Sequence, residues 1–469
     1  MLLLLYLGKI VMRKIHFIAI GGAAMHNLAI DLKNKGFYVT GSDDEIFEPS
    51  RSRLEAHGLL PEKFGWFPEK ITHSTDTVIL GMHAKADNPE LIKAKELGVS
   101  VVSYPEFLYN QTKDKLRIVV AGSHGKTTTT AMILHVLKTL NRKFDYMVGS
   151  QIEGFELMVG LSDNSEIAVF EGDEYLSSPI DLRSKFHWYK PDIAVITGIE
   201  WDHINVFPTF EEYVATFRSF AEAIPETGKL FWYKEDIELQ RIAKSANIKA
   251  DLKHYPGLDW EKRNDYTVIK FSGKEYKSHL FGNHNFQNMN AAMLVCSDLG
   301  IDSDSFLKAM EDFKGASRRL QKIKDSENPI FFDFAHAPSK VRATVLAVRQ
   351  MFPDKKVVAC YELHTFSSLN RKFIPHYSNT LDKADKAFVY FNSDVLKHKS
   401  MPEIDPAFVA ECFKHHNLEV YTDNSLMFEQ IFREWRSGAV VLLMSSGNFG
   451  GYDLQLAISN ACTEQSRSE

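Results

Sequence analysis

The residues best suited to chemistry form a glycine-rich turn at 119–130, where an apolar run leads into VVAGSHGKTTTT. Backbone N–H groups at a helix start lack intrahelical partners and the helix dipole favours negative charge, so this turn is a predicted phosphate site. Lys126 is expected to reach the terminal phosphates of a nucleotide, and the Thr127 hydroxyl to bind Mg²⁺. Only two residues separate Gly122 from Gly125, a shorter spacing than in G-x-x-x-x-G-K-[ST]. The alternative is an ordinary strand, turn and helix whose lysine binds nothing.

Two acidic clusters follow this turn, each at the end of an apolar run. Glu171 stands in VFEGDEY, and Asp202 with His203 stands in IEWDHINVF. Ligands of open α/β sheets gather at the carboxyl ends of strands, so these side chains are expected to face the nucleotide. Mg²⁺ prefers oxygen ligands and substrate phosphates, which suits Thr127 and Glu171. An imidazole is a less common magnesium ligand, and His203 alone is also compatible with a structural role.

The elements that must position these groups alternate between apolar runs and amphipathic stretches. This pattern predicts an α/β fold with parallel sheets covered by helices. Three blocks are visible: strands at 15–20, 37–43, 77–82 and 100–104; a second block that opens with the phosphate turn; and a third that begins near Lys322. A more irregular stretch runs from Gly228 to Gly282.

Composition limits the possible classes of function. A chain of 469 residues is too long for one core, and its net charge of -6 does not favour a nucleic-acid partner. The cysteines lie too far apart to indicate a zinc site or a disulfide framework, so a reducing cytoplasm fits best; they are Cys296, Cys360, Cys412 and Cys462. The apolar run at residues 2–7 lacks a basic flank and is shorter than a membrane span, and Met12 is an alternative start.

The first block raises a second nucleotide hypothesis. Gly21 and Gly22 follow a strand, and Asp43 ends the next one, as in dinucleotide-binding proteins. The third glycine of G-x-G-x-x-G is missing, with Met25 near its place, so a nicotinamide dehydrogenase is disfavoured. A UDP-type nucleotide would use the same crevice equally well. The remaining alternative is that the glycines only permit close packing of strand and helix.

Taken in order, the motifs resemble those of the Mur ligases, ATP-dependent amide-forming enzymes of peptidoglycan synthesis. They are GSHGKTTTT at 122–130, EGDE at 171–174, DH at 202–203, GNHNFQN at 282–288, RR at 318–319 and DFAHAP at 333–338. The resemblance extends from Ile15 to about Ala457. It implies three α/β domains: a Rossmann-like UDP-N-acetylmuramate-binding domain at 1–113, a P-loop-type central ATPase domain at 114–321 and a Rossmann-like ligase domain at 322–469.

The resemblance also implies roles for particular residues. Lys126, Glu171 and His203 would be catalytic, and Thr127, Glu171 and His203 would hold Mg²⁺, with His203 on a second ion. The expected ATP-binding residues are Gly122, Ser123, His124, Gly125, Lys126, Thr127, Thr128, Asn285, Asn288, Arg319 and Asp333. The expected UDP-sugar-binding residues, in and around GSDDEIFEPS and GMHAKADNPE, are Gly21, Gly22, Ala23, Met25, Ser42, Asp43 and His83.

The chemistry implied is transfer of the ATP γ-phosphoryl group to a carboxylate, followed by attack of an amine on the acyl phosphate. Two anions must approach for the first step, so metal ions and Lys126 are needed to neutralise their repulsion. ATP is therefore the co-substrate, with two Mg²⁺ ions. The expected enzyme is cytoplasmic, a monomer or homodimer, and binds neither nucleic acid nor membrane. A ligase-derived binding module without turnover is the alternative from another class.

The amine substrate separates two enzymes of the muramate-using branch, one adding L-alanine and one adding the tripeptide L-alanyl-gamma-D-glutamyl-meso-diaminopimelate. Alanine-adding enzymes usually carry His-Arg-Phe-Thr where this chain has His364, Thr365, Phe366 and Ser367. The stretches DEYLSSPIDLRSKF at 173–186 and MSSGNFGGYDLQL at 444–456 resemble the tripeptide-adding enzyme, which we therefore predict. Candidate contacts for the amine substrate are Arg183, Lys185, His336 and His364, although Arg183 and Lys185 are also compatible with a solvated surface.

Overall fold

The computed structural model describes residues 13–264, 266–399 and 401–468. The predicted amino-terminal extension and the alternative start at Met12 lie outside these residues, as does the side chain of Cys462. The chain divides into two compact units. The first unit comprises residues 1–121, 142–194 and 223–228, and the second comprises residues 122–141, 195–222 and 229–469.

The first unit opens with four parallel strands in the order β2-β1-β3-β4. They are β1 (Lys14–Ile18), β2 (Tyr38–Ser42), β3 (Thr77–Leu80) and β4 (Ser100–Ser103), with helices α1 (Ala23–Asn34), α2 (Ser50–Ala56), η1 (Pro68–Lys70), α3 (Pro89–Glu96) and α4 (Tyr104–Thr112). Consecutive side chains such as Val78 and Ile79 are both fully buried, so both faces of the sheet are covered. The four strands predicted in this block are confirmed.

The rest of the first unit contains strands from the middle of the chain. Strand β5 (Leu116–Ala121) pairs in parallel with β8 (Ile167–Glu171), β8 with β6 (Asp145–Met147), and β6 antiparallel with β7 (Val159–Gly160). A separate antiparallel hairpin joins β9 (Leu176–Ser178) to β10 (Asp181–Ser184), and α6 (Lys185–Tyr189) follows it. Strand β11 (Ile193–Ile196) spans the division between the units.

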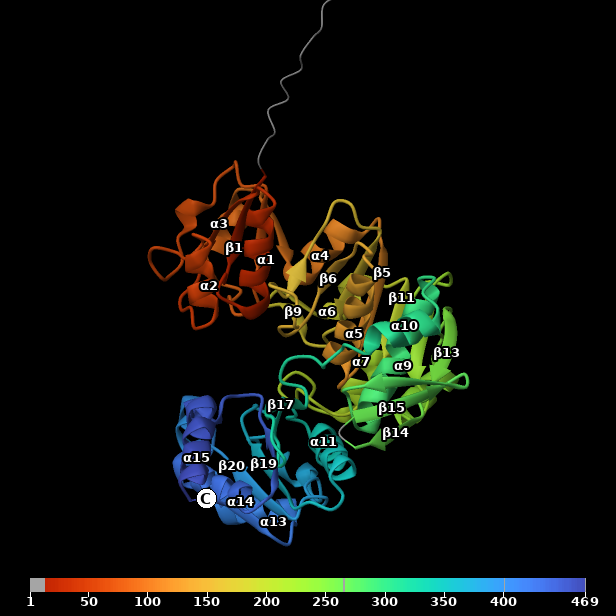
Figure 1. The fold of residues 1–469 in the computed structure, drawn as a ribbon. Helices are drawn as coiled ribbons and strands as arrows, with labels where there is room; N and C mark the ends of the chain where they lie inside the picture. The colour runs from red at the N-terminus through yellow and green to blue at the C-terminus, as the bar shows by residue number, and fades with distance from the viewer. Residues whose placement is uncertain (1–12, 265, 400, 469) are drawn as a thin grey trace, which may run out of the picture. The chain divides into compact units, whose positions relative to one another are not determined.

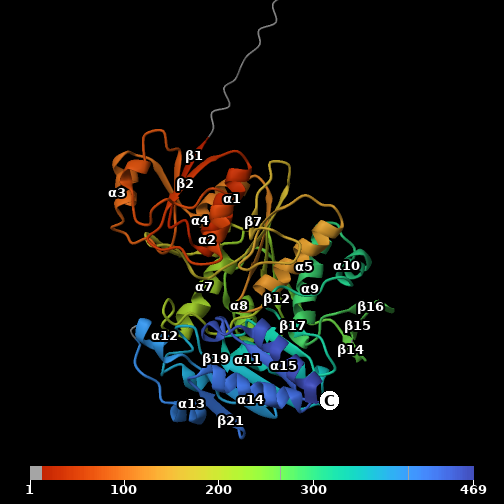
Figure 2. The same ribbon diagram turned by 60° about the vertical axis from the view of Figure 1, so that its left-hand side comes forward.

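The second unit begins with α5 (Lys126–Thr139), the helix that follows the phosphate turn, and α7 (Phe210–Glu222). Strands β12 (Lys229–Tyr233) and β13 (Asp251–Tyr255) pair in parallel, with α8 (Ile237–Ser245) between them in the chain. Strands β14 (Trp260–Arg263), β15 (Tyr266–Phe271) and β16 (Lys274–Ser278) form an antiparallel sheet. Figure 2 shows this sheet beside α9 (Asn283–Asp298), and α10 (Ser303–Met310) follows that helix.

The carboxyl-terminal part of the second unit is a six-stranded sheet in the order β17-β18-β22-β19-β20-β21, parallel except for β17. Its strands are β17 (Gln321–Lys324), β18 (Ile330–Asp333), β19 (Val357–Glu362), β20 (Lys386–Tyr390), β21 (Leu418–Tyr421) and β22 (Val440–Met444). The connecting helices are α11 (Pro338–Met351), η2 (Ile374–Tyr377), α12 (Ser393–His398), α13 (Pro406–Phe413), α14 (Asn424–Arg436), η3 (Phe449–Gly451) and α15 (Leu454–Ser468).

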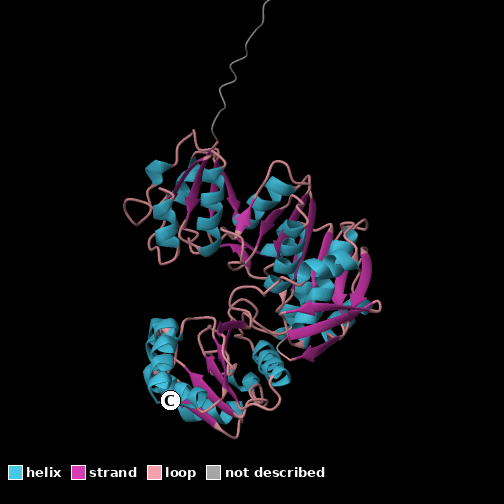
Figure 3. Cartoon of the chain, in the orientation of Figure 1, coloured by secondary structure: helices cyan, strands magenta, loops and turns pink. Residues whose placement is uncertain are grey.

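Helices cover both faces of this sheet (Figures 1 and 3). Val357, Ala359 and Tyr361 of β19 pack into the cluster that includes α11 and α13. The intervening Val358 and Cys360 pack into the cluster that includes α14 and α15. Because strand residues alternate between faces, burial on both sides explains the continuous apolar run VVACY. The predicted α/β class is confirmed, and none of the described helices is both long and apolar enough to cross a membrane.

Candidate active site

The phosphate turn connects β5 to α5, and its two glycines adopt backbone conformations that favour glycine. Gly122 has φ +128° and Gly125 has φ +79°. A β-carbon on Gly122 would overlap the Thr197 hydroxyl, and one on Gly125 would overlap the Asn288 amide oxygen. Both positions therefore require glycine, for conformation and for space. The shortened spacing in the sequence is compatible with a tight turn directly before the helix.

Hydrogen bonds from the segment after β11 and from α7 fix this turn. Ser123 donates its N–H to the Gly198 carbonyl at 2.9 Å. Its hydroxyl oxygen accepts the Glu200 N–H and the Tyr213 hydroxyl, each at 2.8 Å. The Thr197 hydroxyl donates to the His124 carbonyl. The turn is thus held from several directions before any ligand binds.

The turn also presents donors that the protein leaves unused. The backbone N–H groups of His124 and Gly125 have no hydrogen-bond partner within the described part of the chain. They stand at the amino-terminal end of a 14-residue helix, where the dipole favours an anion. Lys126 Nζ is held at the turn by donating to the Gly122 carbonyl at 2.5 Å. This arrangement fits a phosphate group.

His124 of the turn has basic side chains nearby. Burial first, and then the nearby Lys340, His284 and Lys126, lower the pKa of His124 to about 4. The imidazole is therefore neutral near pH 7, and the ammonium groups of Lys126 and Lys340 remain as positive charge. A polyphosphate is the class of ligand that this combination favours.

Glu171, the expected metal ligand, ends β8 in the first unit and is 7% exposed. Its Oε2 accepts the Gly149 N–H at 2.7 Å, and a β-carbon on Gly149 would lie 2.9 Å from its Oε1. The carboxylate is therefore fixed by a residue that must remain small. No cluster of three His, Cys, Asp or Glu side chains able to hold a metal occurs among the described residues. Mg²⁺ commonly takes one or two carboxylates together with substrate phosphates and water, and Glu171 offers one carboxylate.

His203 lies in a strained turn of the second unit, with φ +56°. Its N–H donates at 2.8 Å to Oδ1 of Asp202, which is buried. Oδ2 of Asp202 lies 3.2 Å from His336 Nε2 and 3.4 Å from Lys340 Nζ. Burial acts to raise the pKa of Asp202, but His203, Lys340 and His336 together hold it well below its usual range. Asp202 therefore stays ionised and links the DH and DFAHAP motifs.

The asparagines expected at the adenine lie on α9 and are both buried. Asn285 donates its Nδ2 to the Phe281 carbonyl at 2.8 Å, which fixes its amide. Asn288 lies beside the phosphate turn, because its Oδ1 is the atom that a β-carbon on Gly125 would meet. The structure therefore brings Asn288 to the turn, although an interaction with adenine remains a prediction.

Asp333 is the last residue of β18, and Arg319 lies just before β17. The Asp333 carboxylate accepts the Leu320 N–H on Oδ2 and the Ala335 N–H on Oδ1, each at 2.7 Å. The Arg319 guanidinium lies 4.7 Å from the centre of the Phe334 ring. Asp333 thus orders the segment that carries Arg319, and the predicted contact with ATP remains to be tested.

The residues expected at the UDP-sugar lie at the end of β2, in the segments that follow β1, β2 and β3, and in the first turn of α1. Asp43 Oδ2 accepts the Gly21 N–H at 2.7 Å, and burial first raises the pKa of Asp43 to about 6. Met25 and Ser42 are buried, whereas Ala23 and His83 are exposed. Gly22 precedes α1 as its N-cap residue. The structure brings Gly21 and Asp43 into contact, and it leaves His83 on the surface.

The amine-substrate candidates occupy separate places. Lys185 Nζ pairs with Asp173 at 2.7 Å, and Arg183 pairs with Asp181 at 2.9 Å. His336 belongs to the Asp202 cluster. His364 lies against the Gly447 backbone, because a β-carbon on Gly447 would come within 2.6 Å of its Nδ1.

Comparison with known proteins supplies the family. Three family models match: "Mur ligase family, catalytic domain" at residues 14–115, "Mur ligase middle domain" at 120–296 and "Mur ligase, glutamate ligase domain" at 318–447. A UDP-N-acetylmuramate--L-alanine ligase from Caldicellulosiruptor bescii is 33% identical over 399 residues, covering 81% of this chain and 83% of its own. The chain belongs to the Mur ligase family.

Two solved structures extend this result. The UDP-N-acetylmuramate:L-alanyl-gamma-D-glutamyl-meso-diaminopimelate ligase from Neisseria meningitides is 27% identical, with a TM-score of 0.59 over 66% of this chain and 100% of that chain. The UDP-N-acetylmuramate-alanine ligase MurC from Thermotoga maritima has a TM-score of 0.66 over 97% of this chain and 100% of that chain, at 22% identity. The predicted three-domain α/β fold is therefore confirmed, and this Mur ligase is an ATP-dependent amide-forming enzyme.

Sequence reasoning missed two side chains of this Mur ligase. Lys340, in the first turn of α11, lies 3.1 Å from Nε2 of His336, which precedes that helix, so their closeness in the sequence was an available signal. Glu362 is buried at the end of β19 and accepts the Phe449 N–H at 2.9 Å, close to His364. No local pattern marks the hydrogen bonds that fix Glu362, because Ser445 and Phe449 lie more than 80 residues away.

Proposed function

We propose that this Mur ligase joins an amine to the lactyl carboxylate of UDP-N-acetylmuramate, using ATP and Mg²⁺. The observation that carries the proposal is the phosphate turn, where the N–H groups of His124 and Gly125, which have no partner among the described residues, adjoin Lys126. The names of the curated relatives support the muramyl nucleotide as acceptor. Gly21 and Asp43 are the proposed contacts on the first unit, with the other predicted UDP-sugar residues around them.

The reaction follows from the charges of the reactants. A carboxylate oxygen attacks the γ-phosphorus, the bond to the ADP oxygen breaks, and an acyl phosphate forms. The amine nitrogen then attacks the acyl carbon, inorganic phosphate leaves and the nitrogen loses a proton. Lys126 offsets the repulsion between the two anions in the first step. Thr127, Glu171 and His203 would hold Mg²⁺, which supplies further positive charge at the transferred phosphoryl group.

L-alanine is the amine that the curated relatives support. Those at 32–33% identity over about four fifths of the chain are named UDP-N-acetylmuramate--L-alanine ligase. This favours the alternative that the sequence prediction placed second. The reaction would then yield one new amide bond per ATP.

The tripeptide is the second candidate for the amine substrate, and a specific observation in the sequence supports it. Thr365 occupies the position where alanine-adding enzymes usually have arginine, next to His364. The tripeptide-adding ligase from Neisseria meningitides also matches two thirds of the chain at 27% identity. Loss of the arginine removes a fixed donor for a carboxylate, which is the group that L-alanine would present.

Phosphate release tests both levels of the proposal. The full chain would be assayed with UDP-N-acetylmuramate, ATP and Mg²⁺, and with L-alanine or the tripeptide in turn. We expect release that depends strictly on the muramyl nucleotide and on one of the amines. Phosphate release in the absence of any amine would contradict ligation. The ratio of kcat/KM for the tripeptide to kcat/KM for L-alanine assigns the amine.

A further inference from the structure

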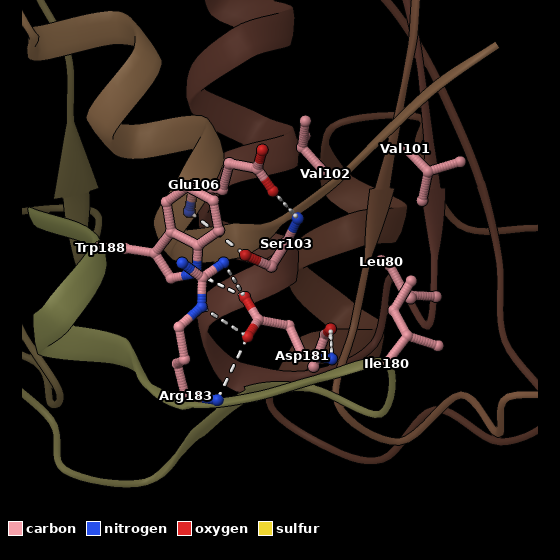
Figure 4. A pocket seen from close by; sticks show the side chains of 10 residues that line it. Leu80, Val101, Val102, Ser103, Glu106, Ile180, Asp181, Arg183 and Trp188 are labelled. Atoms are coloured by element: carbon pink, nitrogen blue, oxygen red, sulfur yellow. Dashed lines mark hydrogen bonds and ion pairs between the residues drawn. The ribbon is translucent and has the colours of Figure 1, made fainter.

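A pocket of about 290 Å³ lies in the first unit. None of its lining residues belongs to the phosphate turn at 122–130. It is lined by the ends of β3 and β4, the first turn of α4, the turn between β9 and β10, and Trp188 of α6. Figure 4 shows charged and aromatic side chains on one side of it and Leu80, Val101 and Ile180 on the other. The pocket therefore has a polar wall and an apolar wall.

Arg183 is held rigidly in the polar wall. Asp181 accepts its Nε on Oδ1 and its Nη2 on Oδ2, each at 2.9 Å. The guanidinium lies 4.2 Å from the centre of the Trp188 ring, and the Trp188 indole donates to Asp181 Oδ2 at 2.7 Å. Stacking and a bidentate ion pair together fix the plane and the direction of the guanidinium.

The outer edge of this guanidinium remains available. Nη1 and the second N–H of Nη2 make no hydrogen bond within the described part of the chain. A guanidinium edge of this kind matches a carboxylate with two parallel hydrogen bonds. Because Asp181 and Trp188 already hold the side chain, binding would cost little side-chain entropy. Lys185 differs, since its ammonium is already paired with Asp173 at 2.7 Å.

Glu106 supplies the opposite charge in the same pocket. Its Oε2 accepts the Ser103 N–H at 3.3 Å, and it forms no ion pair among the described residues. Burial first, and also repulsion from Asp181, raise the pKa of Glu106 above its ordinary value, against the smaller lowering effects of the Ser103 N–H and of Arg183. A positively charged group in the pocket would relieve this repulsion. The walls thus offer sites for a carboxylate, for an ammonium group and for an aliphatic chain.

We propose that this pocket binds the zwitterionic end group of an extended amine substrate, with its carboxylate on the outer edge of Arg183 and its ammonium facing Glu106. The aliphatic part would lie against Leu80 and Ile180. The inference rests on the proposed function and, within it, selects the tripeptide, whose diaminopimelate end carries both charges on an aliphatic chain. L-alanine does not fit the role, because its only amine is the reacting group.

The test compares the tripeptide with L-alanine in the phosphate-release assay for wild type, Arg183→Ala, Arg183→Lys and Glu106→Gln. We expect Arg183→Ala to raise the KM for the tripeptide about 10-fold to 100-fold, the usual effect of losing a charge-assisted bidentate contact, with little change in kcat. Arg183→Lys keeps the charge but loses the paired donors, so its KM should be intermediate. Glu106→Gln should raise the KM severalfold.

The matched control is Arg263→Ala, which removes an exposed arginine paired with Glu261 and Glu275 on another sheet. It should leave the KM for both amines unchanged. The inference is overturned if Arg183→Ala leaves the tripeptide KM within twofold of wild type, if it raises the KM for UDP-N-acetylmuramate equally, or if the wild type ligates L-alanine and rejects the tripeptide. The last result leaves the ligase function intact, whereas release with no amine overturns the proposed function itself.

Discussion

The phosphate turn at 122–130 and the β9–β10 hairpin at 176–184 fix their functional groups by different means. In the turn, glycine conformations and backbone hydrogen bonds determine the geometry, and the side chains of Ser123, Thr197 and Tyr213 support it. In the hairpin, one exposed ion pair and one aromatic stack position Arg183. Backbone-determined sites tolerate few sequences, whereas a side-chain-determined site is altered by single substitutions. If the hairpin binds the amine substrate, as we propose, single substitutions there would change the amine while the phosphate turn keeps the ligase chemistry.

Lys126→Ala should have the largest effect. Removing the ammonium group held at the phosphate turn should lower kcat about 1,000-fold with either amine, because the charge that offsets phosphoryl repulsion is lost. Calorimetric titration should show that UDP-N-acetylmuramate still binds. Loss of that binding would show that the turn and the muramyl site are not separable.

His203→Ala should be the next most severe. If His203 holds a metal in the reacting complex, acyl-phosphate formation should slow about 100-fold while the Kd for ATP changes little. Single-turnover measurements separate the two steps. Turnover at the wild-type rate would make the strained turn at His203 purely structural.

Gly125→Ala tests whether the backbone itself is the essential part of the turn. Gly125 has φ +79°, and the added methyl group would overlap the Asn288 side chain. We therefore expect kcat/KM for ATP to fall about 10-fold to 100-fold. Gly98→Ala is the control, since Gly98 has φ +66° with nothing within 4 Å of the added atom. It should cost only about 1 kcal/mol of unfolding free energy and leave ATP kinetics unchanged. Equal kinetic effects from both changes would contradict the comparison.

Asp181→Asn should have the smallest effect. It removes the charged partner of Arg183 in a hairpin whose arginine is 62% exposed, so the unfolding free energy should fall by no more than about 1 kcal/mol. Urea unfolding measures this change. We expect kcat for acyl-phosphate formation to be preserved, in contrast to the three variants at or near the phosphate turn.

Much of the fold was predictable, because apolar runs such as 357–361 are buried on both faces and leave a strong signal. The stretch 228–282 was described only as irregular, yet it contains β12 to β16. Strands such as β14 (WEKR) and β16 (KEYKS) are short and largely polar, and β14 is only partly buried. Their pairing depends on neighbours in the sheet, which local composition does not reveal.

The candidate site was predictable where a motif is local. The turn at 122–127 and the strand-end carboxylate Glu171 were identified from adjacent residues. The contact of Asp202 with His336 and Lys340 was not, because Asp202 lies more than 130 residues from both and meets them only in the folded chain. The sequence shows two basic side chains at Arg183 and Lys185 but does not distinguish them. Their different ion-pair partners, Asp181 and Asp173, are seen only in the structure.

The raised pKa of Asp43 has a thermodynamic consequence. Burial is its main cause, and it brings the pKa to about 6 in the folded protein. A carboxyl group with a higher pKa in the folded than in the unfolded state stabilises the fold at low pH, and this contribution is lost as pH rises through about 6. Near neutral pH the first unit therefore contains an ionised carboxylate whose burial costs free energy. Any ligand that donates a hydrogen bond to Asp43 returns part of that free energy as affinity.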